Sequence, residues 1–597
     1  MANNRTRLIA GALFAFALLP ATGQSKRNKQ SQAAPATNAA PKPEAIDLEF
    51  ITRLRQEEFY HGKVMDIMSS LTDAIGPRLT GSPNMKRANE WTRDELAHYG
   101  LVNSHVEPWG TFGRGWQYQF ASVRMTAPDY MQFIAMPEAW TPGTNGALKG
   151  EPVHVVINTP EDIEKYRGKL GGKIVMLGDS RIPPPLEKPQ FQRLTKEELE
   201  KESQYEIPGG ANPRFDPATF ARRFALQQQI TKFFAEEKVA AVLKPTREPG
   251  QDGTIFVQSG GPFQLDQPAS TVPSLVLAIE HFGRVVRLLD QKKPVEVEVN
   301  VQANLIEDGD HQGYDTVAEI PGTDPNLKDQ LVMLGGHMDS WHAGEGATDN
   351  AAGVSVAMEA VRLLKQLGVQ PRRTIRIALW SGEEEGLCGS RGYVFNHFGG
   401  RGSEAPKCGA RTMPGQRQPQ QPLTLKPEQK LVSAYFNLDN GTGRVRGVYL
   451  QENEFVRPIF EKWMEPFHDL GMTTLSPANT GGTDHLSFDA VGIPGFQFIQ
   501  DPMDYDTLTH HSNLDVYEHI RPEDMKQAAV IMASFVYNAA QRDDMMPRKP
   551  IRPDEPPAPS TPESESGREK KGEPVPPPSN PGNPTQPQPQ PQQQNPR

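Results

Sequence analysis

Short apolar runs alternate with amphipathic stretches over much of the chain. Four runs in the C-terminal half are apolar, short and bounded by glycine or polar residues, a pattern typical of buried strands. They cover residues 331–334, 374–380, 431–438 and 496–499. Helical stretches lie between some of them, and buried strands that alternate with helices form open sheets. The pattern therefore predicts an α/β fold with a mixed, largely parallel sheet flanked by helices.

The region between residues 135 and 300 has a different sequence pattern. Short β-branched runs at 153–157, 173–177 and 239–243 are separated by turns rich in glycine and proline. This pattern predicts a small β-rich domain inserted into a larger domain. We therefore expect the following division of the folded chain: a larger domain made of residues 48–134 and 301–545, and an insertion over residues 135–300.

The two ends of the chain are expected to lie outside these domains. A basic start, an apolar run over residues 8–19 and small residues after it predict a secretory signal peptide over residues 1–23. That run is too short to cross the ~30 Å of a bilayer core, so we expect a secreted or periplasmic protein whose mature chain is not inserted in a membrane. Residues 24–47 and the Pro- and Gln-rich residues 546–597 are predicted to be disordered.

Composition narrows the function classes. The 597 residues carry a net charge of −10, which argues against a nucleic-acid-binding protein because such proteins need a basic surface. The two cysteines are too few for a disulfide scaffold or a cysteine-based zinc site. A disulfide between Cys388 and Cys408, beside a predicted loop at 399–429, is compatible with export, but the sequence leaves it open. Eight of the 14 histidines lie between residues 331 and 520, so candidate chemistry concentrates there.

Acidic and histidine side chains follow the ends of the predicted strands. The carboxyl ends of parallel strands meet at one edge, where the active sites of open α/β sheets lie. Taken singly, these residues have ordinary alternatives: Asp349 fits a helix cap, and the three consecutive acids 383–385 fit a solvated helix start. Together they predict one site, formed by His337, Asp339, Asp349, Glu383, Glu384, Asp439, Asp484, His485 and one of the adjacent histidines His510 and His511.

The chemistry of this set points to zinc. It combines imidazole and carboxylate groups without a thiolate, which suits Zn²⁺. The adjacent carboxylates 383 and 384 suit two roles, since one binds a metal ion while the other takes a proton from metal-activated water. The three negative charges of Asp349, Glu384 and Asp439 against two zinc ions leave one positive charge, which favours a bound hydroxide. A serine nucleophile is not indicated, because the sequence lacks a Gly-x-Ser-x-Gly motif.

The segments that contain these residues resemble those of the co-catalytic zinc exopeptidases, the family that includes secreted leucyl aminopeptidases and glutamate carboxypeptidases. The similarity is closest at 337–349, is also seen at 76–83, and extends over roughly residues 48–540. It implies the zinc-peptidase fold with a protease-associated insertion and two Zn²⁺ ions per chain. It also implies the following roles: Asp349 bridges the ions, His337 and Asp439 complete one site, Glu384 and His511 complete the other, Glu383 is the general base, Asp339 orients His337, and His485 with Asp484 lies in the substrate pocket. His511 is chosen over His510 because the family's histidine is followed by Ser/Thr-x-x-Asp, here Ser512 to Asp515.

We therefore expect a zinc-dependent exopeptidase that hydrolyses terminal bonds of peptides or dipeptides by metal-activated hydroxide. The general frequency within the family favours an aminopeptidase. The segment 337–349 favours the alternative, a dipeptidase or glutamate carboxypeptidase of the carboxypeptidase Q type. Remote alternatives are a glutaminyl-cyclase-like acyltransferase with a single zinc ion and a receptor-like scaffold that has lost its metal ligands. Peptides are the expected partners, and the oligomeric state is left open.

Overall fold

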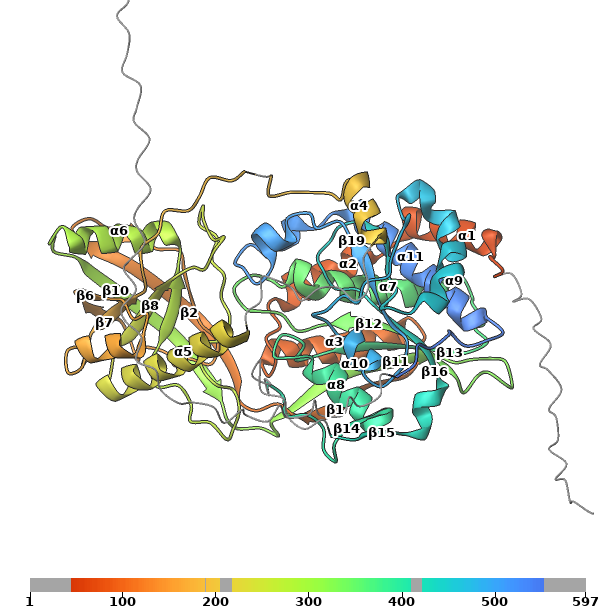
Figure 1. The fold of residues 1–597 in the computed structure, drawn as a ribbon, viewed down its shortest axis with the longest axis horizontal. Helices are drawn as coiled ribbons and strands as arrows, with labels where there is room; N and C mark the ends of the chain where they lie inside the picture. The colour runs from red at the N-terminus through yellow and green to blue at the C-terminus, as the bar shows by residue number, and fades with distance from the viewer. Residues whose placement is uncertain (1–43, 188, 205–216, 410–420, 552–597) are drawn as a thin grey trace, which may run out of the picture. The chain divides into compact units, whose positions relative to one another are not determined.

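The computed structural model describes residues 44–187, 189–204, 217–409 and 421–551, and the observations below concern those residues. The largest sheet has eight strands, which are, in spatial order, β1 (Val102–Thr111), β11 (Gln312–Ile320), β13 (Thr374–Trp380), β12 (Leu331–His337), β16 (Val432–Asn437), β19 (Gly495–Gln500), β17 (Val445–Tyr449) and β18 (Thr474–Ser476). Figure 1 labels β1, β11, β12, β13, β16 and β19 of this sheet. The central strands β13, β12, β16 and β19 are parallel, whereas β1, β11 and β17 pair antiparallel with their inner neighbours. The predicted α/β class and the four predicted strands are confirmed.

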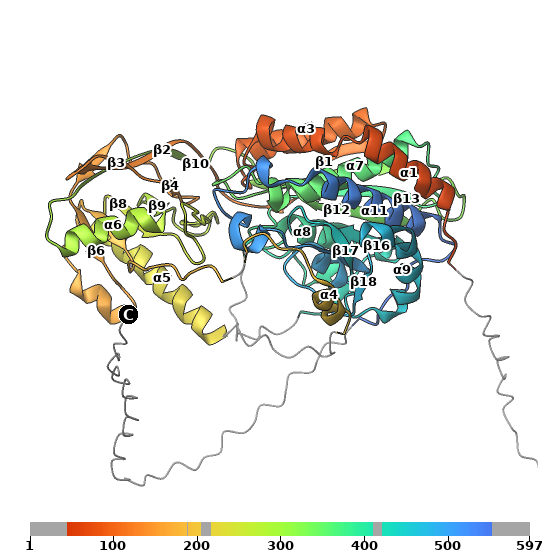
Figure 2. The same cartoon turned by 90° about the horizontal axis from the view of Figure 1, so that it is seen from above.

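Helices cover both faces of this sheet. One core cluster contains residues of α1 (Leu48–His61), α2 (Val64–Ser69), α3 (Pro83–His98), α7 (Ala352–Gln366), α9 (Arg457–Met464) and α11 (Pro522–Gln541). The opposite cluster contains residues of α8 (Cys388–His397) and α10 (His485–Asp489). In Figure 2, α1 and α3 run along the upper edge of this part of the molecule, above β12 and β16.

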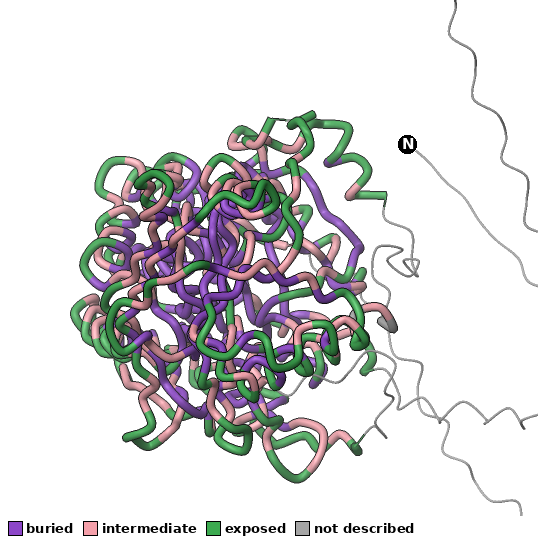
Figure 3. Tube along the Cα trace, turned by 90° about the vertical axis from the view of Figure 1, so that its left-hand side faces the viewer, coloured by how far each residue is buried: buried purple, intermediate pink, exposed green. Residues whose placement is uncertain are grey.

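β12 shows how one strand supplies both clusters. Alternate side chains of a strand point to opposite faces of its sheet. Val332 and Leu334 accordingly pack with the α7 and α11 cluster, and Leu331 and Met333 pack with the α8 and α10 cluster. The whole strand is buried, as are most of the interior segments in Figure 3. A strand buried on both faces explains the continuous apolar run in the sequence.

A second group of strands lies between β1 and β11 along the chain, and we call residues 115–306 the β2–β10 region. One of its sheets is β3 (Met131–Gln132), β2 (Gly115–Ala127), β10 (Glu296–Ile306) and β5 (Leu148–Gly150). The other is β4 (Ala135–Pro137), β9 (Ser274–Leu277), β8 (Ala241–Pro245), β7 (Ile174–Leu177) and β6 (Pro152–Val155). The strands predicted at 153–157, 173–177 and 239–243 are therefore present as β6, β7 and β8.

Two features of the β2–β10 region differ from the expected β-rich insertion. It also contains three helices, α4 (Lys196–Ser203), α5 (Pro217–Glu237) and α6 (Ile279–Asp290). The expected start at residue 135 separates β2 and β3 from β10, although these strands share one sheet. The division of the chain into domains stays a prediction, and the shared sheet favours a start near residue 115.

Shorter elements complete the chain. The turns with 3-10 or π geometry are η1 (Ser70–Ile75), η2 (Pro160–Lys165), η3 (Ala347–Ala351), η4 (Pro427–Leu431), η5 (Glu454–Val456), η6 (Glu465–Leu470), η7 (Tyr505–Thr509) and η8 (Tyr517–His519). The predicted loop at 399–429 contains a two-stranded ribbon of β14 (Gly399–Arg401) and β15 (Leu423–Leu425). A disulfide joins Cys388 to Cys408, so β14 lies within the segment that it closes and β15 follows that segment.

Most of the two chain ends lies outside the described residues. The signal peptide at 1–23, nearly all of the linker at 24–47 and the tail from residue 552 lie outside the described residues. Within the part of the chain that the structure describes, no helix combines the length and the apolarity that are needed to cross a bilayer.

Candidate metal centre

The predicted ligands gather at the carboxyl edge of the parallel strands. His337 is the last residue of β12, and Asp349 lies in η3, between β12 and α7. Glu384 follows β13, Asp439 follows β16, and His511 follows η7, which comes after β19. The strand order therefore brings together residues that are up to 174 positions apart, from 337 to 511.

The carboxylate of Asp349 lies between two sets of donor atoms. Its Oδ1 is 3.4 Å from Nε2 of His337, and that nitrogen is 3.4 Å from Oδ1 of Asp439. Its Oδ2 is 3.2 Å from Nε2 of His511, and that nitrogen is 2.9 Å from Oε2 of Glu384. The five residues predicted as metal ligands are thus brought together as two sets that share Asp349.

Several oxygens of this group have no hydrogen-bond partner although they are buried. They are Oδ2 of Asp349, Oε1 of Glu384 and Oδ1 of Asp439. A buried carboxylate without compensation is costly, and a cation is the usual compensation. Since the set offers nitrogen and oxygen but no sulfur, it fits a zinc ion.

Burial and the histidines determine the protonation of these carboxylates. Burial opposes ionisation of Asp349, but the attraction of the neighbouring His337 and His511 side chains holds its pKa well below the usual range. Burial raises the pKa of Glu384 to about 7, against the attraction of His511. A bound cation would favour the ionised form of both groups.

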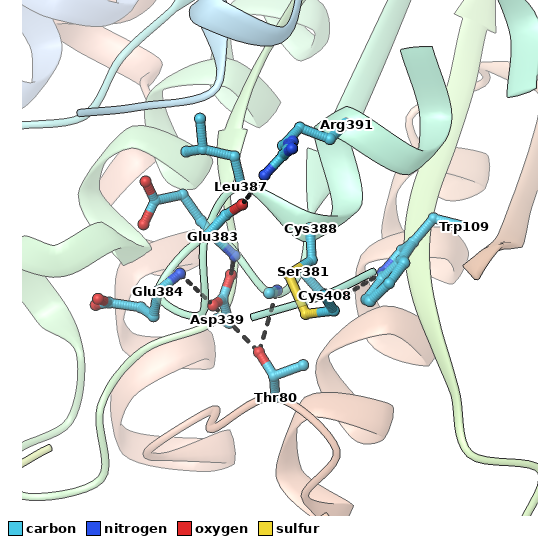
Figure 4. The surroundings of a disulfide bond; sticks show 12 residues. Thr80, Trp109, Asp339, Ser381, Glu383, Glu384, Leu387, Cys388, Arg391 and Cys408 are labelled. Carbon is cyan, nitrogen blue, oxygen red and sulfur yellow. Dashed lines mark hydrogen bonds between the residues drawn. A yellow bond between two sulfur atoms is a disulfide. The ribbon is translucent and has the colours of Figure 1, made fainter. Parts of the chain in front are cut away.

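Asp339 connects His337 to the acidic turn after β13. Its two carboxylate oxygens accept the backbone N–H groups of Glu383 and Glu384, each at 3.2 Å, as Figure 4 shows. Nδ1 of His337 lies 3.1 Å from the backbone oxygen of Asp339 and 3.6 Å from its Oδ1. The backbone oxygen is therefore the hydrogen-bond acceptor for His337, and the carboxylate holds the turn that carries both glutamates.

Glu383 lies beside the donor sets without belonging to either. Burial raises its pKa well above the usual range, and the charges of Asp439 and Asp484 add to the effect while His337 opposes it. In Figure 4 the side chains of Glu383 and Glu384 leave the turn in different directions. A carboxyl group with a raised pKa beside a cation site is chemically suited to accept and release a proton.

Asp484 and His485 are placed differently from the other predicted residues. Both are fully buried, and Nε2 of His485 lies 2.8 Å from Nε2 of Gln451 and 3.2 Å from the backbone oxygen of Thr480. Burial lowers the pKa of His485 to about 4, so the ring is neutral. These contacts are internal, and a role of this pair toward substrate stays a prediction.

Three contributors were not expected from the sequence. Nε1 of Trp341 donates to Oε2 of Glu384 at 2.8 Å. His510, set aside in favour of His511, has its Nε2 3.8 Å from Oδ2 of Asp349, and its side chain is 37 % exposed. The amide nitrogen of Gln258 lies 2.9 Å from Nδ1 of His511. Trp341 stands within the segment 337–349, but Gln258 is too remote in sequence for any local signal.

The chain is similar to known proteins in this part and beyond it. Residues 315–536 match the model of Peptidase family M28. Carboxypeptidase Q of Mus musculus is 25 % identical over 490 residues, which cover 82 % of this chain and 88 % of that protein. Aminopeptidase YwaD of Bacillus subtilis (strain 168) is 27 % identical over 219 residues, 36 % of this chain and 42 % of that protein. A Peptidase M28 precursor from Shewanella amazonensis shares the fold, with a TM-score of 0.58 and 20 % identity over 84 % of this chain and 98 % of that chain.

Proposed function

This chain belongs to peptidase family M28 and is a metal-dependent exopeptidase, and on that premise we propose that its metal centre binds two zinc ions and hydrolyses a terminal bond of a peptide. The observation that carries the proposal is the position of Asp349, whose two oxygens face separate donor sets. A carboxylate in this position can bridge two cations. His337 with Asp439 would complete one zinc site, and His511 with Glu384 the other.

The remaining chemistry falls to Glu383. Zinc, when bound, lowers the pKa of a water molecule to ~7 and polarises the scissile carbonyl. Glu383 accepts the proton that the attacking water loses as its oxygen bonds to the carbonyl carbon. The same carboxyl then gives this proton to the amine nitrogen as the carbon–nitrogen bond breaks. Asp339 keeps Glu383 in place by accepting its backbone N–H.

We favour attack from the amino end of the peptide. The support is the similarity to aminopeptidase YwaD of Bacillus subtilis, which is 27 % identical over 219 residues.

A carboxypeptidase Q-type activity is the second candidate. Its support is the similarity to carboxypeptidase Q of Mus musculus, which covers 82 % of this chain, whereas the similarity to aminopeptidase YwaD covers 36 %. The longer match leaves out 107 of the 597 residues, fewer than the 192 residues of the β2–β10 region, so it includes part of that region. A shared region outside the metal centre favours a shared mode of substrate recognition.

The deciding experiment is mass spectrometry of one defined peptide after incubation with the zinc-loaded protein. The peptide is supplied free, N-acetylated and C-amidated, with a dipeptide alongside, and the Glu383→Gln variant serves as the inactive control. Stepwise loss from the amino end that acetylation abolishes establishes the aminopeptidase. Loss from the carboxyl end, or cleavage of the dipeptide alone, establishes the carboxypeptidase Q-type activity.

Metal analysis of the same sample tests the ion count. Two zinc ions per chain are expected. One zinc ion together with formation of pyroglutamate would favour the acyltransferase alternative. Peptides that stay intact at full zinc content would refute the proposed function.

We also propose that the protein is exported. The pattern of residues 1–23 supports this, and so does the disulfide between Cys388 and Cys408, because disulfides persist mainly in oxidising compartments. Fractionation of expressing cells, followed by N-terminal sequencing, would reveal a start near residue 24 if the signal peptide is removed.

A further inference from the structure

The loop that carries His511 is held by segments from the β2–β10 region. We call residues 501–515 the His511 loop. It is contacted on one side by residues 253–258 and on another by residues 190–194. Neither segment contains a predicted metal ligand. The arrangement makes the geometry of one donor set depend on a distant part of the chain.

The first contact is a short antiparallel pairing. The backbone N–H of Val257 donates to the carbonyl of His511 at 3.1 Å, and Phe256 forms a β-bridge with Ser512. The backbone N–H of Ile255 donates to Oδ1 of Asn513 at 2.8 Å, and the N–H of Asn513 donates back to Ile255 at 3.1 Å. These bonds place the next side chain along the strand, that of Gln258, against the imidazole of His511.

The second contact anchors the start of the same loop. Gln192 and Met503 exchange two backbone hydrogen bonds, at 2.7 and 2.8 Å. Arg193 forms an ion pair at 2.9 Å with Asp501, which is fully buried, and the N–H of Leu194 donates to the same carboxylate at 3.0 Å. The loop is therefore attached to the β2–β10 region at both of its ends, with His511 close to the second attachment.

The chemistry of imidazole assigns a direction to the Gln258 contact. Nε2 of His511 faces Asp349 and Glu384, where a cation would take its lone pair. A neutral imidazole has one N–H, so Nδ1 of His511 must carry the hydrogen when Nε2 binds a metal ion. The group that receives this hydrogen must be an acceptor, and the amide oxygen of Gln258 reaches the same place when the amide is rotated.

We propose that Gln258 is a positioning residue for the metal centre, which accepts the Nδ1–H of His511 and so fixes the tautomer and orientation of this ligand. The inference rests on the proposed function, since it takes His511 as a zinc ligand. Partners of this kind change metal affinity by roughly 10–100-fold when they are removed. Gln258 is exposed, so its replacement leaves the hydrophobic core intact.

The test compares zinc affinity in full-length variants, measured by competition with a chelator and in the absence of substrate. Gln258→Met removes the acceptor at similar side-chain length, and Gln258→Glu retains an acceptor but has no N–H donor. The matched control is Gln267→Met, because Gln267 is also exposed and its side-chain amide donates to Gln264, away from the His511 loop. Thermal unfolding of the metal-free variants shows whether each one folds.

The proposal expects at least tenfold weaker zinc binding in Gln258→Met, and affinity within about threefold of the wild type in Gln258→Glu and Gln267→Met. Unchanged affinity in Gln258→Met would overturn it. Equal weakening in Gln258→Met and Gln258→Glu would also overturn it, since the amide would then act as a donor or as a structural group. A wild-type protein that binds no zinc and cleaves no peptide refutes the proposed function instead, so the two failures are distinguishable.

Discussion

Removal of the disulfide between Cys388 and Cys408 is expected to destabilise the protein by a predictable amount. The two cysteines are separated by 20 positions, and both are buried. A cross-link that closes a loop of this length lowers the entropy of the unfolded chain by an amount worth about 3 kcal/mol at 25 °C. For a folded part of about 500 residues, the unfolding entropy is on the order of 1 kcal/mol per degree, so the Tm should fall by about 3 °C.

The disulfide also borders the acidic turn. The N–H of Cys388 donates to the carbonyl of Gly382 at 2.8 Å, and Figure 4 shows the sulfurs beside the turn of Glu383 and Glu384. Loss of the cross-link should therefore loosen this turn. A modest loss of kcat is expected to accompany the loss of stability.

The assay is differential scanning calorimetry of the oxidised wild type, the reduced wild type and the double variant Cys388→Ala, Cys408→Ala. Reduction and double substitution should lower Tm to a similar extent, and reductant should leave the double variant unchanged. A Tm within about 1 °C of the wild type in both cases would refute the entropic reasoning. A fall of more than about 10 °C would refute it as well, because native contacts rather than chain entropy would then dominate.

Four further outcomes are expected. Glu383→Gln should keep its zinc content and lose at least about 100-fold in kcat, and retained turnover would exclude it as the general base. Trp341→Phe keeps an aromatic ring but removes the N–H donated to Glu384, so zinc affinity should fall roughly tenfold in a chelator competition, and an unchanged affinity would contradict this. Chelation should abolish activity and lower Tm, because the buried carboxylates of the metal centre lose their compensating charge, and added zinc should restore both. Burial raises the pKa of Glu58 from 4.5 to about 10, so the folded protein keeps a proton that the unfolded chain releases above pH 4.5, and stability falls as the pH rises towards 10. In urea unfolding, Glu58→Gln should therefore be more stable than the wild type at pH 8 and similar to it at pH 4. Between these values the free energy of unfolding of the wild type should fall relative to the variant by at most about 1.4 kcal/mol per pH unit. An equal stability difference at pH 4 and pH 8 would contradict the raised pKa of Glu58.

Local pattern was sufficient for the strands that carry the metal centre. β12 is buried on both faces, so its sequence is a continuous apolar run that ends in a polar residue, and β13 differs only in the partly buried Thr374 and Arg376. The carboxyl ends of parallel strands meet at one edge of a sheet, so the sequence predicts that His337, Asp349 and Asp439 lie close together. The group of acidic and histidine side chains that meets at this edge could therefore be predicted from residues 331–511, and the resemblance to a known family selects His511 rather than His510 as the proposed ligand.

Local pattern was not sufficient where partners are distant or where a helix is atypical. α5 lies in a region whose glycine and proline turns suggested strands only, and the pairing of β2 with β10 joins residues on either side of the expected boundary at 135. Such pairings depend on the packing of the whole sheet, because strand propensity does not specify a partner.

The contacts around the ligands were decided by tertiary structure. The sequence by itself determined the fold class and the acidic and histidine residues that follow the strand ends, because burial and alternation act over a few neighbouring residues. It did not determine that Asp339 holds the acidic turn through backbone N–H groups, or that Gln258 lies 2.9 Å from His511 across 253 positions of chain. Contacts of this kind arise only when loops from separate elements meet in space, and no periodicity in the sequence encodes such a meeting.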